Sequence, residues 1–201
     1  MQKSAATHHP VHELIRERWS PRAFSEETVS PEALRSLFEA ARWAPSSNNE
    51  QPWAFLVGTR GDADTFKKIV STLVEVNQSW AKQAPVLAIA VSELAFAKSG
   101  RPNRNAFYDT GAAVSQLTTE ATSRGLFVHQ MAGFDPHKAA EAFAIPNGWE
   151  PIAVFAIGYP GDAQTLPDAL RDRELAPRTR KPLHEFVMSG QWGTPALFVQ
   201  Q

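Results

Sequence analysis

The sequence lacks cysteine, and this absence removes several kinds of chemistry at once. Without thiols the chain cannot form disulfides, use a thiolate nucleophile, or hold zinc or an iron–sulfur cluster through cysteine ligands. Redox chemistry would therefore need a bound cofactor. Long apolar runs are missing too: no stretch approaches the roughly 18 apolar residues of a membrane-spanning helix, and residues 1–10 lack the apolar centre of a signal peptide. We expect a cytoplasmic protein without a membrane partner.

A strong excess of charge of one sign is also missing, because the net charge is −1 at pH 7. Nucleic-acid-binding proteins usually carry a clear basic excess that displaces counterions from phosphates, so we expect no nucleic-acid partner. A length of 201 residues with 43% hydrophobic and 20% charged residues is typical of a single globular domain. His8, His9 and His12 stand beside Glu13, but we interpret them as part of a mobile arm and expect no metal site.

Glycine-rich nucleotide-binding loops are absent as well. The two candidates, residues 58–61 and residues 158–161, lack the glycine spacing of a dinucleotide-binding loop and the hydrophobic helix that should follow it. The chain has no phosphate loop of the Walker type, and neither Ser92 nor Ser189 stands in the setting of a nucleophile elbow. We therefore exclude a Rossmann site.

Hydrophobic periodicity predicts alternating helices and strands. Ser30, Pro31 and Glu32 supply an N-cap, a proline at the first helical position and an acid in the first turn, which predicts the start of a helix. Residues 86–91 are continuously apolar, as in a buried central strand that is covered on both faces. After residue 160 the pattern dissolves, and we expect residues 161–182 to cross a surface or a partner. The predicted helices cover residues 10–19, 31–44, 66–73, 108–124 and 136–143, and the predicted strands cover residues 53–57, 86–91, 126–131 and 152–157. This order suggests one α/β sandwich.

Three polar or basic segments stand out: residues 18–24 (RWSPRAF), residues 44–53 (APSSNNEQPW) and residues 178–182 (RTRKP). Arg18 and Arg22 flank a bend stiffened by Pro21, which suits two guanidinium groups that converge on one phosphate. Arginines near a helix C-terminus are also common as plain surface charges, and this alternative applies equally to Arg178 and Arg180. The three segments together favour a phosphate-bearing, heterocyclic ligand.

In their order along the chain these segments, together with residues 133–135 (GFD) and 180–183 (RKPL), resemble the signatures of the FMN-dependent nitroreductase family. The resemblance spans about residues 11–190. It implies an α+β fold, a sandwich with a central mixed sheet of about four or five strands covered by helices, assembled as an intertwined homodimer. Residues 1–10 would then be a flexible N-terminal arm, residues 11–182 a nitroreductase-like FMN-binding domain, and residues 183–201 a C-terminal tail that docks on the core or on the partner subunit.

The resemblance also implies positions that contact the flavin, each site being assembled from both chains. The first FMN-contacting segment is matched by Arg18, Trp19, Ser20 and Arg22. A late pair that approaches the phosphate is matched by Arg178 and Arg180. Contacts donated by the partner subunit are matched by Pro45, Ser46, Ser47 and Asn49. An asparagine near the flavin pyrimidine is matched by Asn77, and the segment whose backbone N–H approaches flavin N5 is matched by Ala132 and Gly133.

The function that the resemblance implies is that of an oxidoreductase with FMN as cofactor and NADH or NADPH as electron donor. The expected reaction is ping-pong: hydride passes from NAD(P)H to flavin N5, and electrons then pass to a nitroaromatic, quinone or similar small-molecule acceptor. No side chain is expected to be catalytic, because the flavin carries the chemistry. Two alternatives stay open: a flavin enzyme of the same superfamily that performs reductive dehalogenation or flavin fragmentation, and a non-catalytic flavin-binding protein.

Four further residues are interpreted from their local pattern. Phe107 and Tyr108 fit either an acceptor channel or the packed face of a helix. We expect His129, inside a strand pattern, to be a structural histidine. Gln51 is expected to hold the backbone of its own loop.

Overall fold

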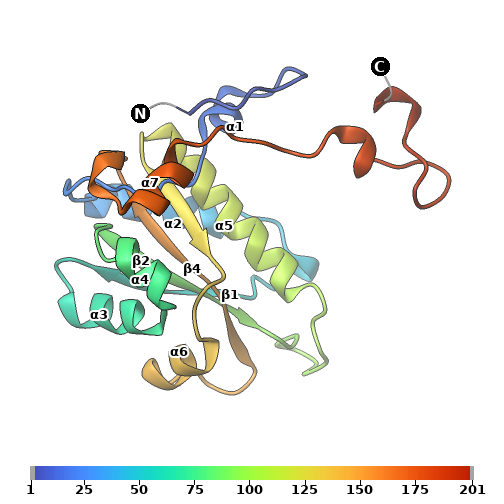
Figure 1. The fold of residues 1–201 in the computed structure, drawn as a ribbon. Helices are drawn as coiled ribbons and strands as arrows, with labels where there is room; N and C mark the ends of the chain where they lie inside the picture. The colour runs from blue at the N-terminus through green and yellow to red at the C-terminus, as the bar shows by residue number, and fades with distance from the viewer. Residues whose placement is uncertain (1–2, 200–201) are drawn as a thin grey trace.

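A sheet of four strands lies at the centre of the computed structural model, which describes residues 3–199 (Figure 1). Its strands are β1 (Trp53–Thr59), β2 (Val86–Glu93), β3 (Phe127–Met131) and β4 (Trp149–Gly158), in the spatial order β1-β2-β4-β3. The helices are α1 (Glu13–Glu17), α2 (Pro31–Arg42), α3 (Ala63–Thr72), α4 (Glu75–Ala81), α5 (Ala106–Ser123), α6 (Pro136–Ala142) and α7 (Asp168–Leu175). Short 3-10 turns are η1 (Ser47–Asn49), η2 (Ala163–Thr165), η3 (Leu183–Glu185) and η4 (Leu197–Val199). None of the helices in residues 3–199 combines the length and the hydropathy needed to span a bilayer.

The strand directions correct one detail of the expected fold. The sheet was expected to be mixed, but every pair of neighbouring strands is antiparallel. β2 and β3 do run in the same direction, as is usual for strands joined by a long helical crossover, and α5 forms that crossover. β4, however, lies between them and pairs antiparallel with both. The alternating order of helices and strands predicts the crossover from β2 to β3, but not that β4 inserts between these two strands.

β2 lies at the centre of the core, and its side chains pack against helices on both faces of the sheet. Leu87 and Ile89 point into an apolar cluster that includes Trp80 of α4, whereas Val86 and Ala88 point into a second cluster formed with α2 and α5. Side chains of a strand alternate between the two faces, so this division follows from position alone. The prediction of a buried central strand is confirmed: all of β2 except its last residue is buried.

Helix starts and stops follow local signals where those signals are strong. Ser30 caps α2 as predicted, since its hydroxyl oxygen accepts the N–H of Ala33 at 3.1 Å and Pro31 occupies the first turn. Within residues 161–182, where the sequence pattern predicts no element, α7 forms and buries Leu170 and Glu174. Most residues of α7 are polar or charged, so its sequence lacks the apolar periodicity that predicts a helix.

The N-terminal segment, expected to be a flexible arm, makes specific contacts from Lys3 onward. Lys3 Nζ donates hydrogen bonds to the carbonyl oxygens of Glu174 and Ala176 at 2.5 and 2.6 Å. Ser4 Oγ donates to the carboxylate of Glu17 at 2.6 Å. These bonds connect the start of the chain to α1 and to the end of α7.

The C-terminal tail (residues 183–199) projects away from the rest of the chain (Figure 1). Its backbone closes a small hairpin in which Met188 bridges to Pro195 and the N–H of Ser189 donates to the carbonyl oxygen of Thr194 at 3.0 Å. Trp192 is 92% exposed and Leu197 is 82% exposed. The tail therefore presents apolar side chains that the rest of its own chain does not cover.

His129 on β3 connects the sheet to the segment before α2. Its Nδ1 lies 2.8 Å from the carbonyl oxygen of Pro21, and because a carbonyl can only accept, Nδ1 carries the proton of the neutral ring. The ring also packs on Trp80, with 4.5 Å between the ring centroids. Burial lowers the pKa of His129 to about 4, and the nearby charge of Arg22 acts in the same direction. His129 is thus neutral and structural, as expected.

This pKa makes the stability of the protein depend on pH. The unfolded chain binds a proton on His129 near pH 6.5 and the folded chain only near pH 4, so stability should fall as the pH drops between these values, by about 3 kcal/mol in all. His129→Asn, which retains a donor for Pro21 but does not titrate, should lose this part of the pH dependence in urea unfolding followed from pH 7.5 to 4. His137→Asn, at an exposed histidine of α6, is the control and should behave as the wild type. Identical pH profiles for all three proteins would contradict the assignment.

Candidate functional site

A buried carboxylate of α7 holds the basic bend (residues 18–24). Glu174 is 2% exposed, and its oxygens accept the N–H groups of Arg22 at 2.9 Å and Ala23 at 3.1 Å. The guanidinium of Arg22 lies 3.8 Å from the same carboxylate, so part of its charge compensates Glu174. A buried carboxylate is tolerated when hydrogen bonds and an opposite charge satisfy it. The conformation of the bend is therefore fixed from within the fold.

Three guanidinium groups, of Arg18, Arg178 and Arg180, gather beside this bend, and we call them the arginine cluster. Burial, followed by the positive charges of Arg178 and Arg180, lowers the pKa of Arg18. Burial and the charge of Arg180 also lower the pKa of Arg178, whose Nη1 donates to the carbonyl oxygens of Lys3 at 2.7 Å and Arg16 at 2.9 Å. Within residues 3–199 no carboxylate forms an ion pair with any member of the cluster. The charge of Glu17 acts on the pKa of Arg178 in the opposite direction, but without an ion pair. Guanidinium groups that form no ion pair suit a phosphate.

Trp19 and Ser20 separate the two arginines of the bend and differ in exposure. Trp19 is 5% exposed and packs edge-on against Phe127 of β3, with 6.0 Å between ring centroids. Its indole N–H has no hydrogen-bond partner among the described residues. Ser20 is exposed, and its hydroxyl oxygen accepts from Arg18 Nη1 at 3.3 Å. The Trp19 side chain thus belongs to the core, whereas Ser20 faces outward beside the arginine cluster.

The amide loop (residues 44–53) has a backbone held by its own hydrogen bonds, although it is only partly buried. Asn48, Asn49 and Gln51 have positive φ values of 54°, 57° and 54°, a conformation that asparagine tolerates better than most residues. The hydroxyl oxygen of Ser46 accepts the N–H of Gln51 at 3.0 Å, and Gln51 Nε2 donates to the carbonyl oxygen of Asn49 at 3.0 Å. The expected role of Gln51 as a support of its own loop is confirmed.

A second buried carboxylate anchors this loop to α5. Asp109, in the first turn of α5, is 4% exposed, and its Oδ2 accepts the N–H of Ser47 at 2.9 Å. Ser47 and Asn49 keep their side chains free of hydrogen bonds within residues 3–199, and Pro45 beside them is exposed. The loop therefore presents Pro45, Ser47 and Asn49, which were predicted to contact the flavin, on a fixed backbone.

The amide loop and the arginine cluster lie at opposite ends of α5. Ser47 is bonded to the first turn of this helix, whereas Trp19, next to Arg18, packs on Phe127, shortly after the helix ends. A helix of 18 residues is about 27 Å long. One small phosphate site within a single chain therefore cannot contain both segments.

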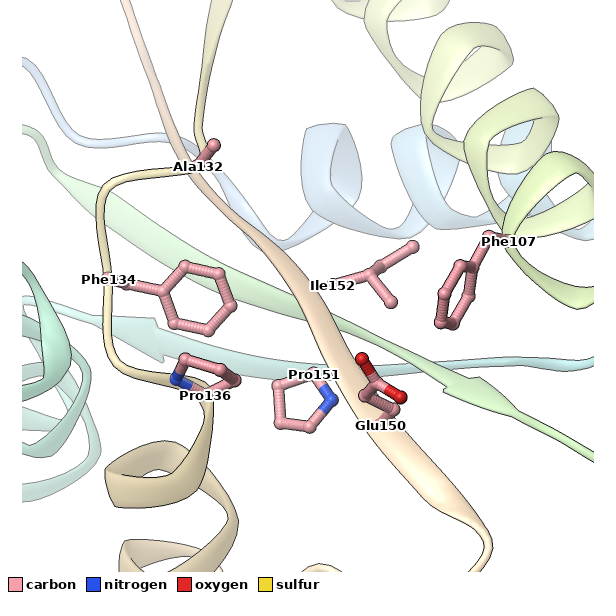
Figure 2. A pocket seen from close by; sticks show the side chains of 7 residues that line it. All are labelled: Phe107, Ala132, Phe134, Pro136, Glu150, Pro151 and Ile152. Carbon is pink, nitrogen blue, oxygen red and sulfur yellow. The ribbon is translucent and has the colours of Figure 1, made fainter.

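A third predicted group comes together beside a cavity of about 430 Å³ (Figure 2). Asn77 Nδ2 donates to the carbonyl oxygen of Gly133 at 3.0 Å, and the N–H of Val74 donates to the same oxygen at 3.1 Å. A side chain at position 133 would place its Cβ 2.6 Å from Asn77 Nδ2, so glycine is required for this approach. None of the hydrogen bonds within residues 3–199 uses the N–H of Ala132 or Gly133.

The cavity is lined mainly by apolar side chains. Figure 2 shows Phe134 on the loop that leaves Ala132, Ile152 on β4 and Phe107 on α5 on the other side. The complete lining is Phe107, Ala132, Phe134, Pro136, Glu150, Pro151 and Ile152. Phe107 thus borders the cavity, while Tyr108 next to it is 81% exposed. An apolar hollow with Asn77 and two unpaired N–H groups near its edge suits a flat heterocyclic ring.

Sequence reasoning missed the two carboxylates that hold the predicted segments, Glu174 and Asp109. Glu174 follows Arg171, Asp172 and Arg173, a charged run that is typical of a solvent-exposed helix. Asp109 stands in a largely apolar helix pattern without a cation at a helical spacing from it. This was the one signal in the sequence that could have indicated a buried carboxylate. Across the described part of the chain no group of three or more histidine, aspartate or glutamate side chains could hold a metal ion.

Comparisons with known proteins agree with this arrangement. The model of the nitroreductase family matches residues 15–159. An uncharacterized 15.4 kDa protein of Mycolicibacterium smegmatis is 40% identical over 150 residues, which are 70% of this chain and 98% of that protein. The FMN reductase (NAD(P)H) of Bacillus subtilis (strain 168) is 28% identical over 160 residues, which are 71% of this chain and 63% of that protein.

Solved structures show the same fold. The crystal structure of an oxidoreductase containing FMN is 35% identical and superposes with a TM-score of 0.89, covering 94% of this chain and 96% of that one. A nitroreductase family protein from Streptococcus pneumoniae TIGR4 is 20% identical with a TM-score of 0.71, covering 89% of this chain and 98% of that one. At such low identity the second likeness concerns the fold alone.

Removing the charge of Glu174 tests how strongly the basic bend depends on it. Glu174→Gln should lower the free energy of unfolding by about 2–3 kcal/mol, because the new amide NH₂ would meet two backbone N–H groups and the charge beside Arg22 would be lost. Asp172→Asn, at an exposed position of the same helix, is the matched control and should change stability little. Urea unfolding measures both, and equal effects would show that Glu174 has no special role.

Proposed function

Because this chain belongs to the nitroreductase family, we propose that it is an NAD(P)H-dependent FMN oxidoreductase that passes electrons to a small-molecule acceptor by a ping-pong mechanism. The likeness to an FMN-containing oxidoreductase over almost the whole chain and to an FMN reductase supports the cofactor. The single observation that carries the proposal is the arginine cluster, three guanidinium groups that form no ion pair with a carboxylate within the described residues.

The residues present fit FMN at both of its ends. The arginine cluster lies near the start of β3, where Trp19 packs on Phe127, and the cavity lies at the other end of this strand, beside Ala132. Five strand residues separate these points by about 16 Å, which suits an elongated ligand with a phosphate at one end and a flat ring at the other. When bound, FMN supplies the redox chemistry: it accepts a hydride from NAD(P)H and returns two electrons to a nitroaromatic, quinone or similar acceptor.

The protein's own groups would bind and orient the cofactor. Arg18 and Arg180 would hold the phosphate with charge-assisted hydrogen bonds, and Arg178, fixed by two carbonyl oxygens, would add charge behind them. Asn77 would lie near the polar edge of the ring, and the free N–H of Gly133 would meet the reacting side of the flavin. Arg22 contributes less to the phosphate, because its charge lies beside Glu174.

We also propose that the working unit is a homodimer in which the amide loop completes the site of the partner subunit. The length of α5 keeps this loop away from the arginine cluster of its own chain, which supports a contribution from a second copy. The projecting C-terminal tail supports it too, since Trp192 and Leu197 are left uncovered in one chain. On this proposal the tail docks on the partner subunit.

The direct test is whether the purified protein takes up FMN and whether NADH or NADPH reduces the bound flavin. In an anaerobic titration each donor should bleach the flavin absorbance, and a quinone or nitroaromatic should restore it. A protein that neither retains FMN nor bleaches with either donor would rule out the oxidoreductase function.

Arg18→Ala and Arg180→Ala should each weaken FMN binding by about 1.5–3 kcal/mol, because each removes a charge-assisted hydrogen bond to the phosphate. Quenching of flavin fluorescence gives the dissociation constant. Arg173→Ala, an exposed arginine without an ion pair among residues 3–199, is the control and should leave it unchanged. If riboflavin, which lacks the phosphate, also bound more weakly to Arg18→Ala and Arg180→Ala, the phosphate assignment would be wrong.

Mixing two defective variants tests the shared site. One copy carries Arg18→Ala with Arg180→Ala, and the other carries Ser47→Ala with Asn49→Gly, which keeps the positive φ at position 49. Random pairing of equal amounts makes about half of the dimers heterodimers. In each heterodimer one of the two sites has both segments intact, so FMN binding should recover at about a quarter of all sites.

Each variant measured alone, as a homodimer, is the control for this recovery. Removal of residues 183–201 from both copies should abolish the recovery together with the dimer, as measured by sedimentation. If heterodimers form without any recovery, both segments serve a site within the same chain.

A further inference from the structure

A hairpin between β2 and α5 carries a cluster of positive charge that the FMN site does not use. Its arms pair through a bridge between Ala95 and Pro102, and the N–H of Phe96 donates to the carbonyl oxygen of Arg101 at 2.9 Å. Gly100 closes the turn with a φ of 65°, and its N–H donates to the carbonyl oxygen of Phe96 at 2.8 Å. We call residues 94–104 the basic hairpin, and these bonds give it a defined shape.

The basic hairpin carries three exposed cations: Lys98, Arg101 and Arg104. Within the described chain no carboxylate forms an ion pair with any of them. Glu50, the one acid of the amide loop, accepts the N–H of Ala97 at 2.5 Å through its Oε1 and forms no ion pair with these cations among the described residues. Three cations without an ion pair on a short, fixed turn attract anions and raise their local concentration.

Two hydrogen bonds and the connection to α5 place the basic hairpin near the cavity. The bond between Glu50 and Ala97 joins it to the amide loop, which Asp109 anchors to the first turn of α5. At its other end the chain enters α5, where Phe107, three residues after Arg104, lines the cavity together with Ala132 (Figure 2). The N–H of Leu94 donates to the carbonyl oxygen of Gly148, shortly before Glu150 of the same cavity. The hairpin therefore lies near the apolar hollow, although none of its residues lines it.

We propose that the basic hairpin binds the 2′-phosphate of NADPH and makes NADPH the preferred electron donor. This inference rests on the proposed function, because the nicotinamide must reach a flavin held at the cavity. NADPH differs from NADH only by a phosphate monoester on the adenosine ribose, which carries close to two negative charges near pH 7. When the nicotinamide enters the hollow, the adenosine end of the extended dinucleotide remains outside, on the side where the hairpin stands. Arg101 and Arg104 supply planar donor groups that match phosphate oxygens, and Lys98 adds a point charge.

The test compares kcat/KM for the two donors in the FMN-loaded protein at fixed ionic strength. The wild type should favour NADPH by about tenfold or more, and Arg101→Ala and Arg104→Ala should each raise the KM for NADPH about tenfold while the KM for NADH changes less than about twofold. Added salt should weaken NADPH binding more than NADH binding. Lys67→Ala on α3, another exposed lysine without an ion pair in residues 3–199, is the matched control.

Binding of nucleotide fragments gives a readout that does not depend on turnover. Adenosine 2′,5′-bisphosphate should bind the wild type at least about tenfold more tightly than 5′-AMP in titration calorimetry, and Arg101→Ala should remove this difference. Equal losses for NADPH and NADH would overturn the proposal, because they would assign the cations to the pyrophosphate that both donors share. A wild type that takes up FMN and oxidises NADH and NADPH equally would overturn it too, while leaving the oxidoreductase function intact. A protein that cannot bind FMN would instead overturn the proposed function itself.

Discussion

The buried carboxylate of Glu174 is the interaction on which the geometry of the candidate site depends. It binds the backbone N–H groups of Arg22 and Ala23, and two other elements hold the same bend. From β3, His129 meets the carbonyl oxygen of Pro21, and shortly after β4 the N–H of Gly161 donates to the carbonyl oxygen of Ala23 at 2.8 Å. Three elements that are distant in sequence thus fix a short turn. The outer side of this turn then presents Arg18. Glu174 belongs to α7, and the chain that follows this helix brings Arg178 and Arg180 close to Arg18.

Asp109 does for the amide loop what Glu174 does for the basic bend. Both carboxylates are almost fully buried and accept backbone N–H groups of a segment that resembles a flavin-binding signature. Such a bond fixes the backbone without using the outward side chains, so Ser47 and Arg18 remain available to a ligand. A loop without this support would have to become ordered on binding, and the entropy cost would reduce affinity. The two anchors therefore act as preorganisation, although neither is expected to touch the cofactor.

The features that the sequence predicts well are those that neighbouring residues determine. The cap of α2 depends on Ser30 and Pro31, and the burial of β2 follows from an unbroken apolar run. The features that it misses join distant residues: Glu174 meets Arg22 across 152 positions, and Asp109 meets Ser47 across 62. Nothing local separates Glu174 from the exposed acids around it, and α7 has no apolar stripe that would predict a helix. The antiparallel sheet was missed for the same reason, because the place of β4 between β2 and β3 depends on pairing and not on periodicity. The family signatures predicted the arginines and the amide loop, but not what holds them in position.

The distribution of charge on this nearly neutral protein is uneven. Several cations are paired within exposed helices, as Arg35 is with Glu32 and Arg124 with Glu120, and such pairs create little field beyond the surface. Other cations, such as Lys67 and Arg173, stand singly without an ion pair among the described residues, whereas the arginine cluster and the basic hairpin each bring three such cations together. On a chain of net charge −1, such local clusters attract anions more strongly than single surface cations do. Each cluster also lies beside an anchored segment, the bend held by Glu174 and the loop held by Asp109. The same buried acids that shape the fold thus hold the segments beside which both clusters lie.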